Sequence, residues 1–169
     1  MTGQDSTQAT ALRRPANDDR EAWKACWKAH GQPWRTEPEI DTRRQEELAK
    51  HREIVPNVEQ GIYLFKDMKL SRADVEWLLA THENGRGPVD WSDESQRERE
   101  GLDLRAADLS RIDLRELPLA CMRGGLTWEE WLHTTPEQRN LAGLHLEGTD
   151  LRRAHLEALP PSKSFVETD

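Results

Sequence analysis

The chain has 169 residues, 33% of them charged, and a formal net charge of −8. This length suits one domain or two small ones, and the high charge excludes a transmembrane span. Acidic residues outnumber basic ones by 20 to 16 in residues 1–100 and by 12 to 8 in residues 101–169. Neither half is basic enough for direct nucleic-acid binding or acidic enough for a dedicated DNA mimic.

We expect a cytoplasmic protein without membrane contact. The opening residues, MTGQDSTQAT, lack the basic and apolar regions of a signal peptide. The two cysteines, Cys26 and Cys121, are too far apart in the sequence for a disulfide framework or a zinc-binding pair. Reduced thiols are typical of the cytoplasm.

The first predicted helix begins at Asn17 or Asp18, both good N-cap residues, and stops before Gly31. Trp23 and Trp27 lie four residues apart and therefore on one face of this helix. Such a pair is more typical of a core or an interface than of a ligand cage.

Two further helices are predicted before the middle of the chain. The capping box Thr36–Glu39 starts a charged helix over 37–54, and the capping box Ser71–Asp74 starts a more apolar helix over 70–84. Between them, residues 61–65 (GIYLF) form an apolar run, which is either a strand or a packed loop.

The most informative pattern is a leucine at every fifth position in two blocks. A period of five belongs to neither an α-helix nor a flat strand, and it indicates a repeat architecture. An aspartate stands before the leucine in four of the eight units, and small or apolar residues often stand two places before it. The repeated leucines are Leu104, Leu109, Leu114 and Leu119, then Leu141, Leu146, Leu151 and Leu156.

The unit resembles that of the pentapeptide-repeat family, A(D/N)LXX. The best matches are residues 107–111 (ADLSR) and 149–153 (TDLRR). The resemblance implies a right-handed quadrilateral β-helix with one unit on each of four faces. Its leucines would then stack inward as an apolar column, with Asp or Asn bonding backbone at the corners. Arg139 at an inward position marks either a degenerate unit or an edge whose arginine reaches solvent.

The expected fold class is therefore α + β, a helical N-terminal region followed by a short β-helix of about two coils. A leucine-rich helix is the weaker alternative, because it would scatter these leucines around its circumference. Two coils bury too little apolar surface to stand alone and need support from the helices or from a second chain. The expected segments are a disordered tail (1–16), a helical cap (17–100), a first block (101–122), a helical insertion (123–138), a second block (139–159) and a C-terminal tail (160–169).

The insertion carries the candidate interface of this sequence. Gly124 and Gly125 break the repeat, and Thr127 is a good N-cap for a short helix that contains Trp128 and Trp131. Insertions in repeat arrays often lie on a binding face. Burial of the two tryptophans against the rest of the chain is the competing interpretation.

No catalytic, cofactor or metal motif is present in the sequence. It contains no G-x-S-x-G, no P-loop, no G-x-G-x-x-G and no C-x-x-C. His145 and His155 replace the aspartate of the repeat two units apart, which is a poor geometry for a shared metal. We therefore expect a protein that is not an enzyme and that binds no cofactor.

The leading hypothesis is a protein–protein interaction or scaffold module built on pentapeptide repeats. Its partner is either an unidentified protein or a second copy that pairs through the exposed edge of the β-helix. The alternative is a DNA-mimicking modulator of a type II topoisomerase (gyrase), an activity that the family resemblance implies. A regulatory or sensor domain is a third interpretation.

Overall fold

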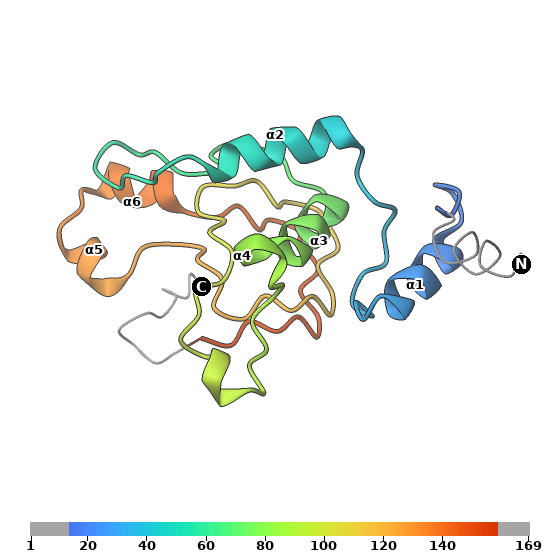
Figure 1. The fold of residues 1–169 in the computed structure, drawn as a ribbon. Helices are drawn as coiled ribbons and strands as arrows, with labels where there is room; N and C mark the ends of the chain where they lie inside the picture. Colours follow the sequence, from blue (N-terminus) through green and yellow to red (C-terminus); the bar gives the residue numbers. More distant parts are fainter. Residues whose placement is uncertain (1–13, 159–169) are drawn as a thin grey trace, which may run out of the picture. The chain divides into compact units, whose positions relative to one another are not determined.

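The structure, a computed structural model, describes residues 14–158. Most of the expected N-terminal tail and all of the expected C-terminal tail (160–169) lie outside the described residues. The chain divides into two units, Met1–Pro38 and Glu39–Asp169, which we describe separately. Figure 1 shows the course of the chain through both.

The first unit contains helix α1, Arg20–Ala29. Its N-cap is Asp19, whose carboxylate accepts a hydrogen bond from the Ala22 N–H at 3.0 Å. The predicted cap was therefore wrong by one or two residues, although the type of residue and the stop before Gly31 (φ +76°) are confirmed.

Tryptophan and arginine side chains build the core of this small unit. Trp23 and Trp27 are both buried, and their ring centroids lie 5.3 Å apart. The Arg35 guanidinium stacks on Trp27 at 3.6 Å from the ring centroid, and the Trp27 indole N–H donates to the Glu37 carbonyl. The tryptophan pair therefore belongs to a core and not to a ligand cage.

The second unit contains all the other helices of residues 14–158. These are α2 (Thr42–Arg52), α3 (Arg72–Ala80), α4 (His82–Gly85), the 3-10 turn η1 (Glu94–Gln96), α5 (Trp128–Leu132) and α6 (Pro136–Ala142). The capping box of Ser71 and Asp74 is confirmed. The box expected at Thr36–Glu39 is wrong, because Asp41 caps α2 by accepting from the Arg44 N–H at 2.8 Å.

The two leucine blocks wind as two stacked turns of chain, a first turn (102–121) and a second turn (144–157). Parallel bridges join Asp108 to His145, Asp113 to Asp150 and Pro118 to His155. On the opposite side of the first turn, Lys69 forms a parallel bridge with Asp108. The first turn thus lies between residue 69 and the second turn.

These bridges remain isolated, and within residues 14–158 the structure has neither a β-strand nor a sheet. The expected β-helix and the expected α + β class are therefore wrong, since all the regular elements of the described chain are helical. The reason is the frequency of bends. A residue with positive φ recurs at every fifth position of the first turn, and each straight segment ends before a ladder extends. These residues are Ala106, Arg111, Glu116 and Cys121.

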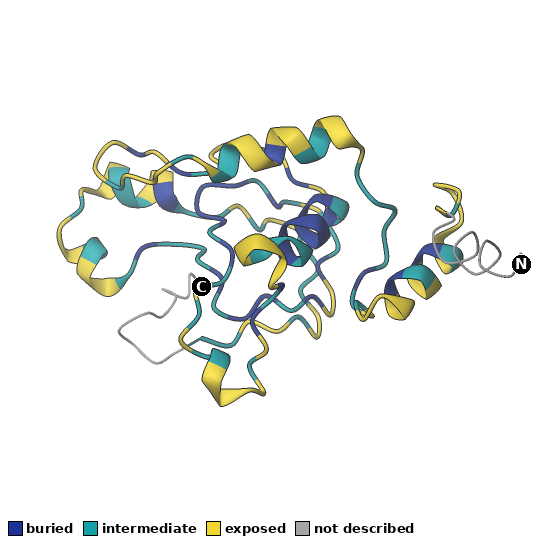
Figure 2. Cartoon of the chain, in the orientation of Figure 1, coloured by how far each residue is buried: buried dark blue, intermediate teal, exposed yellow. Residues whose placement is uncertain are grey.

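The repeated leucines have different environments in the two turns. The four repeated leucines of the first turn are at most 1% exposed, and Figure 2 shows by colour where the chain is buried. In the second turn Leu146 and Leu151 are half-buried, and Leu156 is 37% exposed. Leu141 lies on α6 and is 46% exposed, so it is not a core residue. One turn therefore supplies the core, and the other lies at its margin.

No helix among residues 14–158 combines the length and the apolar character that crossing a bilayer requires.

Candidate interaction surface

Helix α5 presents the most exposed large apolar side chains of the described insertion. Thr127 and Glu130 form a reciprocal capping box, in which each side chain accepts from the backbone N–H of the other residue. Trp128 and Leu132 lie four residues apart on one face and are 55% and 54% exposed. We call these two residues the α5 surface. The cap fixes the helix in place although it has only five residues.

Trp131 lies behind this surface and attaches α5 to the rest of the second unit. Its ring stacks on Trp128 with centroids 5.2 Å apart and an interplanar angle of 9°. The Arg139 guanidinium of α6 lies 3.7 Å from the Trp131 centroid and donates to the Trp131 carbonyl at 2.9 Å. Arg139 is therefore not an inward residue of a degenerate repeat, because it connects the two helices of the insertion.

A small apolar cluster receives Trp131. Its buried members come from four segments distant in the sequence, and they are Tyr63, Ala106, Leu126 and Ala142. Gln138 adds a polar contact by donating its amide N–H to the Glu59 carbonyl at 3.1 Å. The insertion is therefore held to the core. The sequence left open whether the two tryptophans are buried or form an interface. Trp131 is packed against the core, whereas Trp128 is exposed and available for an interface.

A buried arginine lies beneath this cluster. Arg105 is 2% exposed, pairs with Asp103 at 2.7 Å, and approaches Glu130 of α5 at 3.4 Å. Burial opposes the charge on Arg105, but the hydrogen bond to Asp103 and the charges of Asp103 and Glu130 together outweigh it, and the pKa of Arg105 is raised. The Tyr63 ring lies 4.9 Å from the guanidinium, and burial raises the pKa of its hydroxyl. This ion pair network couples the position of α5 to the first turn.

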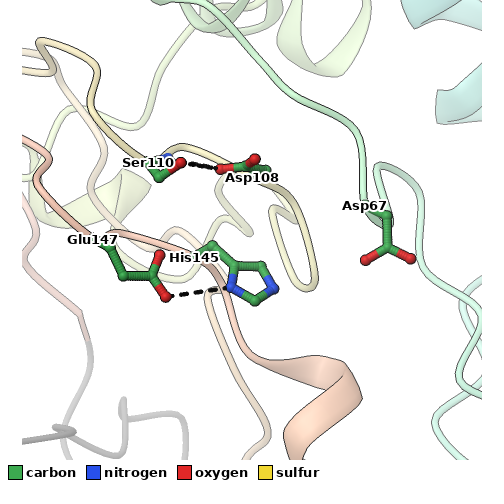
Figure 3. A pocket seen from close by; sticks show the side chains of 5 residues that line it. All are labelled: Asp67, Asp108, Ser110, His145 and Glu147. Carbon is green, nitrogen blue, oxygen red and sulfur yellow. Dashed lines mark hydrogen bonds and ion pairs between the residues drawn. The ribbon is translucent and has the colours of Figure 1, made fainter.

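A shallow pocket of about 210 Å³ lies where the first and second turns meet residue 67 (Figure 3). Asp108 accepts a 2.5 Å hydrogen bond from the Ser110 hydroxyl, and His145 lies 3.5 Å from Glu147. Lys69 also contacts the Ser110 hydroxyl, at 3.2 Å. The Ser110 hydroxyl thus donates to a carboxylate and not to the imidazole, which is the acceptor that would activate a serine nucleophile. Asp67 completes the lining of the pocket.

The residues considered for metal or thiol chemistry are dispersed. His145 and His155 pair with Glu147 and Glu157, and they face different residues of the first turn. Cys26 and Cys121 are half-buried and form no disulfide, and the Cys121 thiol contacts the Arg97 carbonyl at 3.7 Å. Among residues 14–158, no group of three or more His, Cys, Asp and Glu side chains is arranged to hold a metal ion.

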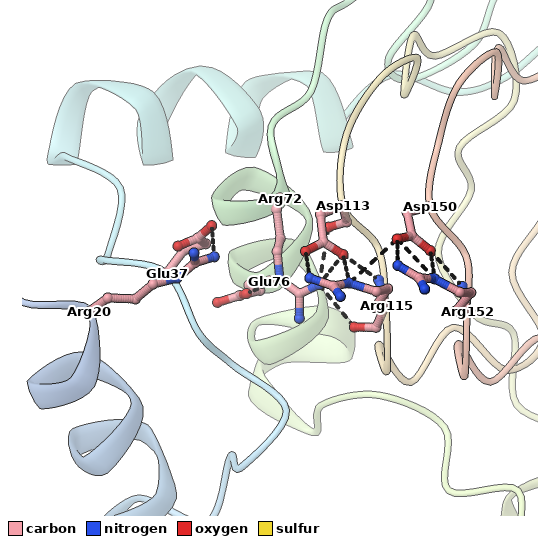
Figure 4. Close-up of polar contacts among 8 residues, drawn as sticks. All are labelled: Arg20, Glu37, Arg72, Glu76, Asp113, Arg115, Asp150 and Arg152. Atoms are coloured by element: carbon pink, nitrogen blue, oxygen red, sulfur yellow. Dashed lines mark hydrogen bonds and ion pairs between the residues drawn. The ribbon is translucent and has the colours of Figure 1, made fainter.

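A ladder of aspartate–arginine pairs was missed from the sequence (Figure 4). In each pair the carboxylate accepts from the guanidinium and from the backbone N–H of the residue two positions later. Arg115 of the first turn also lies 3.6 Å from Asp150 of the second. The signal was the recurring Asp-Leu-Arg, at 103–105, 113–115 and 150–152. These pairs explain the aspartates of the repeat, which bond backbone at the bends as expected.

Comparison with known proteins gives no relative. No family model matches the chain, and neither a curated protein nor a solved structure matches it. Together with the absence of strands from residues 14–158, this finding overturns the resemblance to the pentapeptide-repeat family. The physical reason is that a short motif in eight units specifies a bend and a leucine position, and these are also satisfied by two turns without a sheet.

Proposed function

We propose that this protein is a non-enzymatic, cytoplasmic protein–protein interaction module that binds its partner through the α5 surface. The observation that carries the proposal is that Trp128 and Leu132 are more than half exposed on a helix that is held in place from behind.

The energetics of such a surface favour binding. Tryptophan is the residue most enriched among those that dominate interface energies, and a rigid anchor loses little conformational freedom when it binds. The capping box of Thr127 and the stacking on Trp131 provide this rigidity. The matching partner is a protein with an apolar pocket that accepts an indole ring.

The chemistry of the described residues supports the non-enzymatic part. In the pocket of the second unit, the Ser110 hydroxyl donates to Asp108, and the nearest imidazole pairs with Glu147. General acid–base or nucleophilic catalysis requires these groups to act on one another or on a substrate.

The test is a quantitative pull-down with the full chain as bait. We expect W128A/L132A to lose specific partners that wild type and V55A both retain, since Val55 is equally apolar and 81% exposed but lies outside the insertion. Circular dichroism and thermal melting show whether each variant is folded. Retention of every specific partner by a folded W128A/L132A variant would contradict the proposal.

The gyrase-modulator alternative rested on the family resemblance. No described feature favours it, and Arg152 and Arg153, at 75% and 85% side-chain exposure, oppose it because a DNA mimic requires an acidic surface.

A further inference from the structure

The second turn has an open edge. His145, Asp150 and His155 direct their backbone N–H groups to the first turn, with hydrogen bonds of 2.9–3.0 Å. Since successive residues of an extended segment alternate in direction, the N–H groups of their neighbours point the other way. Those neighbours are Leu146, Leu151 and Leu156, and none of their N–H groups has a backbone partner within residues 14–158.

The same edge is apolar. The four repeated leucines of the first turn are at most 1% exposed, whereas Leu146 and Leu151 of the second turn are half-buried and Leu156 is 37% exposed. Unpaired backbone groups beside half-exposed leucines favour pairing with another chain. We call residues 145–157 the outer edge.

The charges along the outer edge are arranged symmetrically with opposite signs. One residue to either side of Leu151 stand an acid and a base, Asp150 and Arg152. Two residues out, Arg153 lies opposite the neutral Thr149, but two pairs further out again combine one carboxylate and one basic side chain. These pairs are Glu147 with His155, four residues out, and His145 with Glu157, six residues out. Neutral histidine also donates a hydrogen bond to a carboxylate, so the complementarity does not require its charge.

We propose that the outer edge is a self-association surface that binds the outer edge of a second copy in antiparallel orientation. When the two-fold axis passes at Leu151, His145 of one copy lies opposite Glu157 of the other, and Glu147 lies opposite His155. In an isologous contact of this kind, residue i of one copy contacts residue j of the other, and residue j contacts residue i. Leu146 then lies against Leu156 of the second copy, and Leu151 against its equivalent.

The two turns are parallel, unlike the proposed pair of outer edges, but their contact shows that an arginine of the ladder can reach an aspartate of a neighbouring segment. Arg115 pairs with Asp113 at 2.8 Å within the first turn and reaches Asp150 of the next turn at 3.6 Å. In the same way Arg152, paired with Asp150 at 2.7 Å and 75% exposed, is placed to reach Asp150 of the second copy. The dimer thus extends the ladder of Figure 4 by two further pairs. This surface is separate from the α5 surface and does not depend on the function proposed above.

The test is sedimentation velocity of the full chain over a range of concentrations. We expect wild type to form a species of twice the 19.5 kDa chain mass. D150R places an arginine opposite Arg152 of the second copy, and R152D places an aspartate opposite Asp150. Because like charges across an interface cost several kcal/mol, each variant alone should dimerise at least about tenfold more weakly.

Mixing the two variants separates loss of contact from loss of folding. At positions 150 and 152, a D150R chain carries two arginines and an R152D chain carries two aspartates. An equimolar mixture should therefore form a heterodimer. The heterodimer is detected by capturing untagged R152D with tagged D150R. Misfolded chains would not regain association in this way. W128A/L132A should dimerise as wild type does. A wild type that is monomeric at every concentration, or a mixture without heterodimer, would overturn the proposal.

Discussion

The guanidinium of Arg72 lies 2.9 Å from the carboxylate of Glu76, and the two side chains are only 7% and 0% exposed. The same guanidinium donates to the backbone carbonyls of Asp113 and Arg115 at 3.0 and 2.9 Å. A buried ion pair on α3 thus also satisfies backbone acceptors of the first turn. It fixes the helix against the first turn.

Breaking this pair should destabilise the second unit strongly. Removing one partner of a buried pair leaves an uncompensated charge, so we expect R72M to lower the free energy of unfolding by about 3–5 kcal/mol. R72M/E76L removes both charges and should recover much of this loss. Urea denaturation of the two variants measures the difference. A double variant as unstable as R72M would show that the contacts to the Asp113 and Arg115 carbonyls, and not the ion pair, hold the helix.

Equivalent leucines of the two turns should differ in their contribution to stability. Leu109 is 0% exposed and Leu156 is 37% exposed. Leu109→Ala leaves a cavity in a packed core and should cost roughly 3–5 kcal/mol. Leu156→Ala should cost less than about 1 kcal/mol, because its site is open to solvent. Urea denaturation of both variants at the same low protein concentration provides the comparison. Equal losses of stability would contradict the assignment of the core to the first turn.

The bends of the first turn store backbone strain that glycine should relieve. Glu116 has φ +63°, and its side chain is 65% exposed. A non-glycine residue in this region is disfavoured by roughly 1 kcal/mol. We therefore expect E116G to be more stable than E116A by about 1 kcal/mol in thermal or chemical unfolding. The alanine variant is the matched control, since both changes remove the contact to Arg153. A less stable E116G would exclude strain at this bend.

Acid should weaken the ladder through Asp113. The hydrogen bond from Arg115 holds the pKa of Asp113 at about 2, below its ordinary value of 3.8. A depressed pKa means that the stabilisation is complete above the unfolded value and disappears as the pH falls from about 4 to about 2. D113N has no such dependence. Because the Asp113 side chain is 35% exposed, solvent screens the interaction, and we expect the free energies of unfolding of wild type and D113N to differ by only about 1 kcal/mol at pH 7. Urea denaturation at pH 7 and pH 3 should show that the difference in stability between wild type and D113N is smaller at pH 3. An equal difference at both pH values would contradict a stabilising role of ionised Asp113.

Local signals in the sequence predicted local structure well. The capping boxes of Ser71 and Thr127 involve side chains and backbone groups only three residues apart, so their formation needs no tertiary contact. The box expected at Thr36 failed because Asp41 provides an alternative cap five residues later. Where two cap signals compete, packing of the following helix decides between them.

The candidate site was predicted only in part. Trp128 and Trp131 stood out as a tryptophan pair on a short helix, but their separate roles depend on Tyr63, which is distant in the sequence. The burial of Arg105 had no signal, because arginine is ordinarily exposed and its partner Glu130 lies twenty-five positions later.

The sequence by itself determined the five-residue spacing of bends and leucines, the helix caps at Ser71 and Thr127, and the symmetric charges of the outer edge, because these depend on neighbouring residues. Only the tertiary structure decided that the bends prevent a sheet, that the leucines of one turn form the core, and that those of the other remain at its margin. Burial and pairing depend on which segments lie side by side, and a repeated motif does not encode which of its copies will be covered.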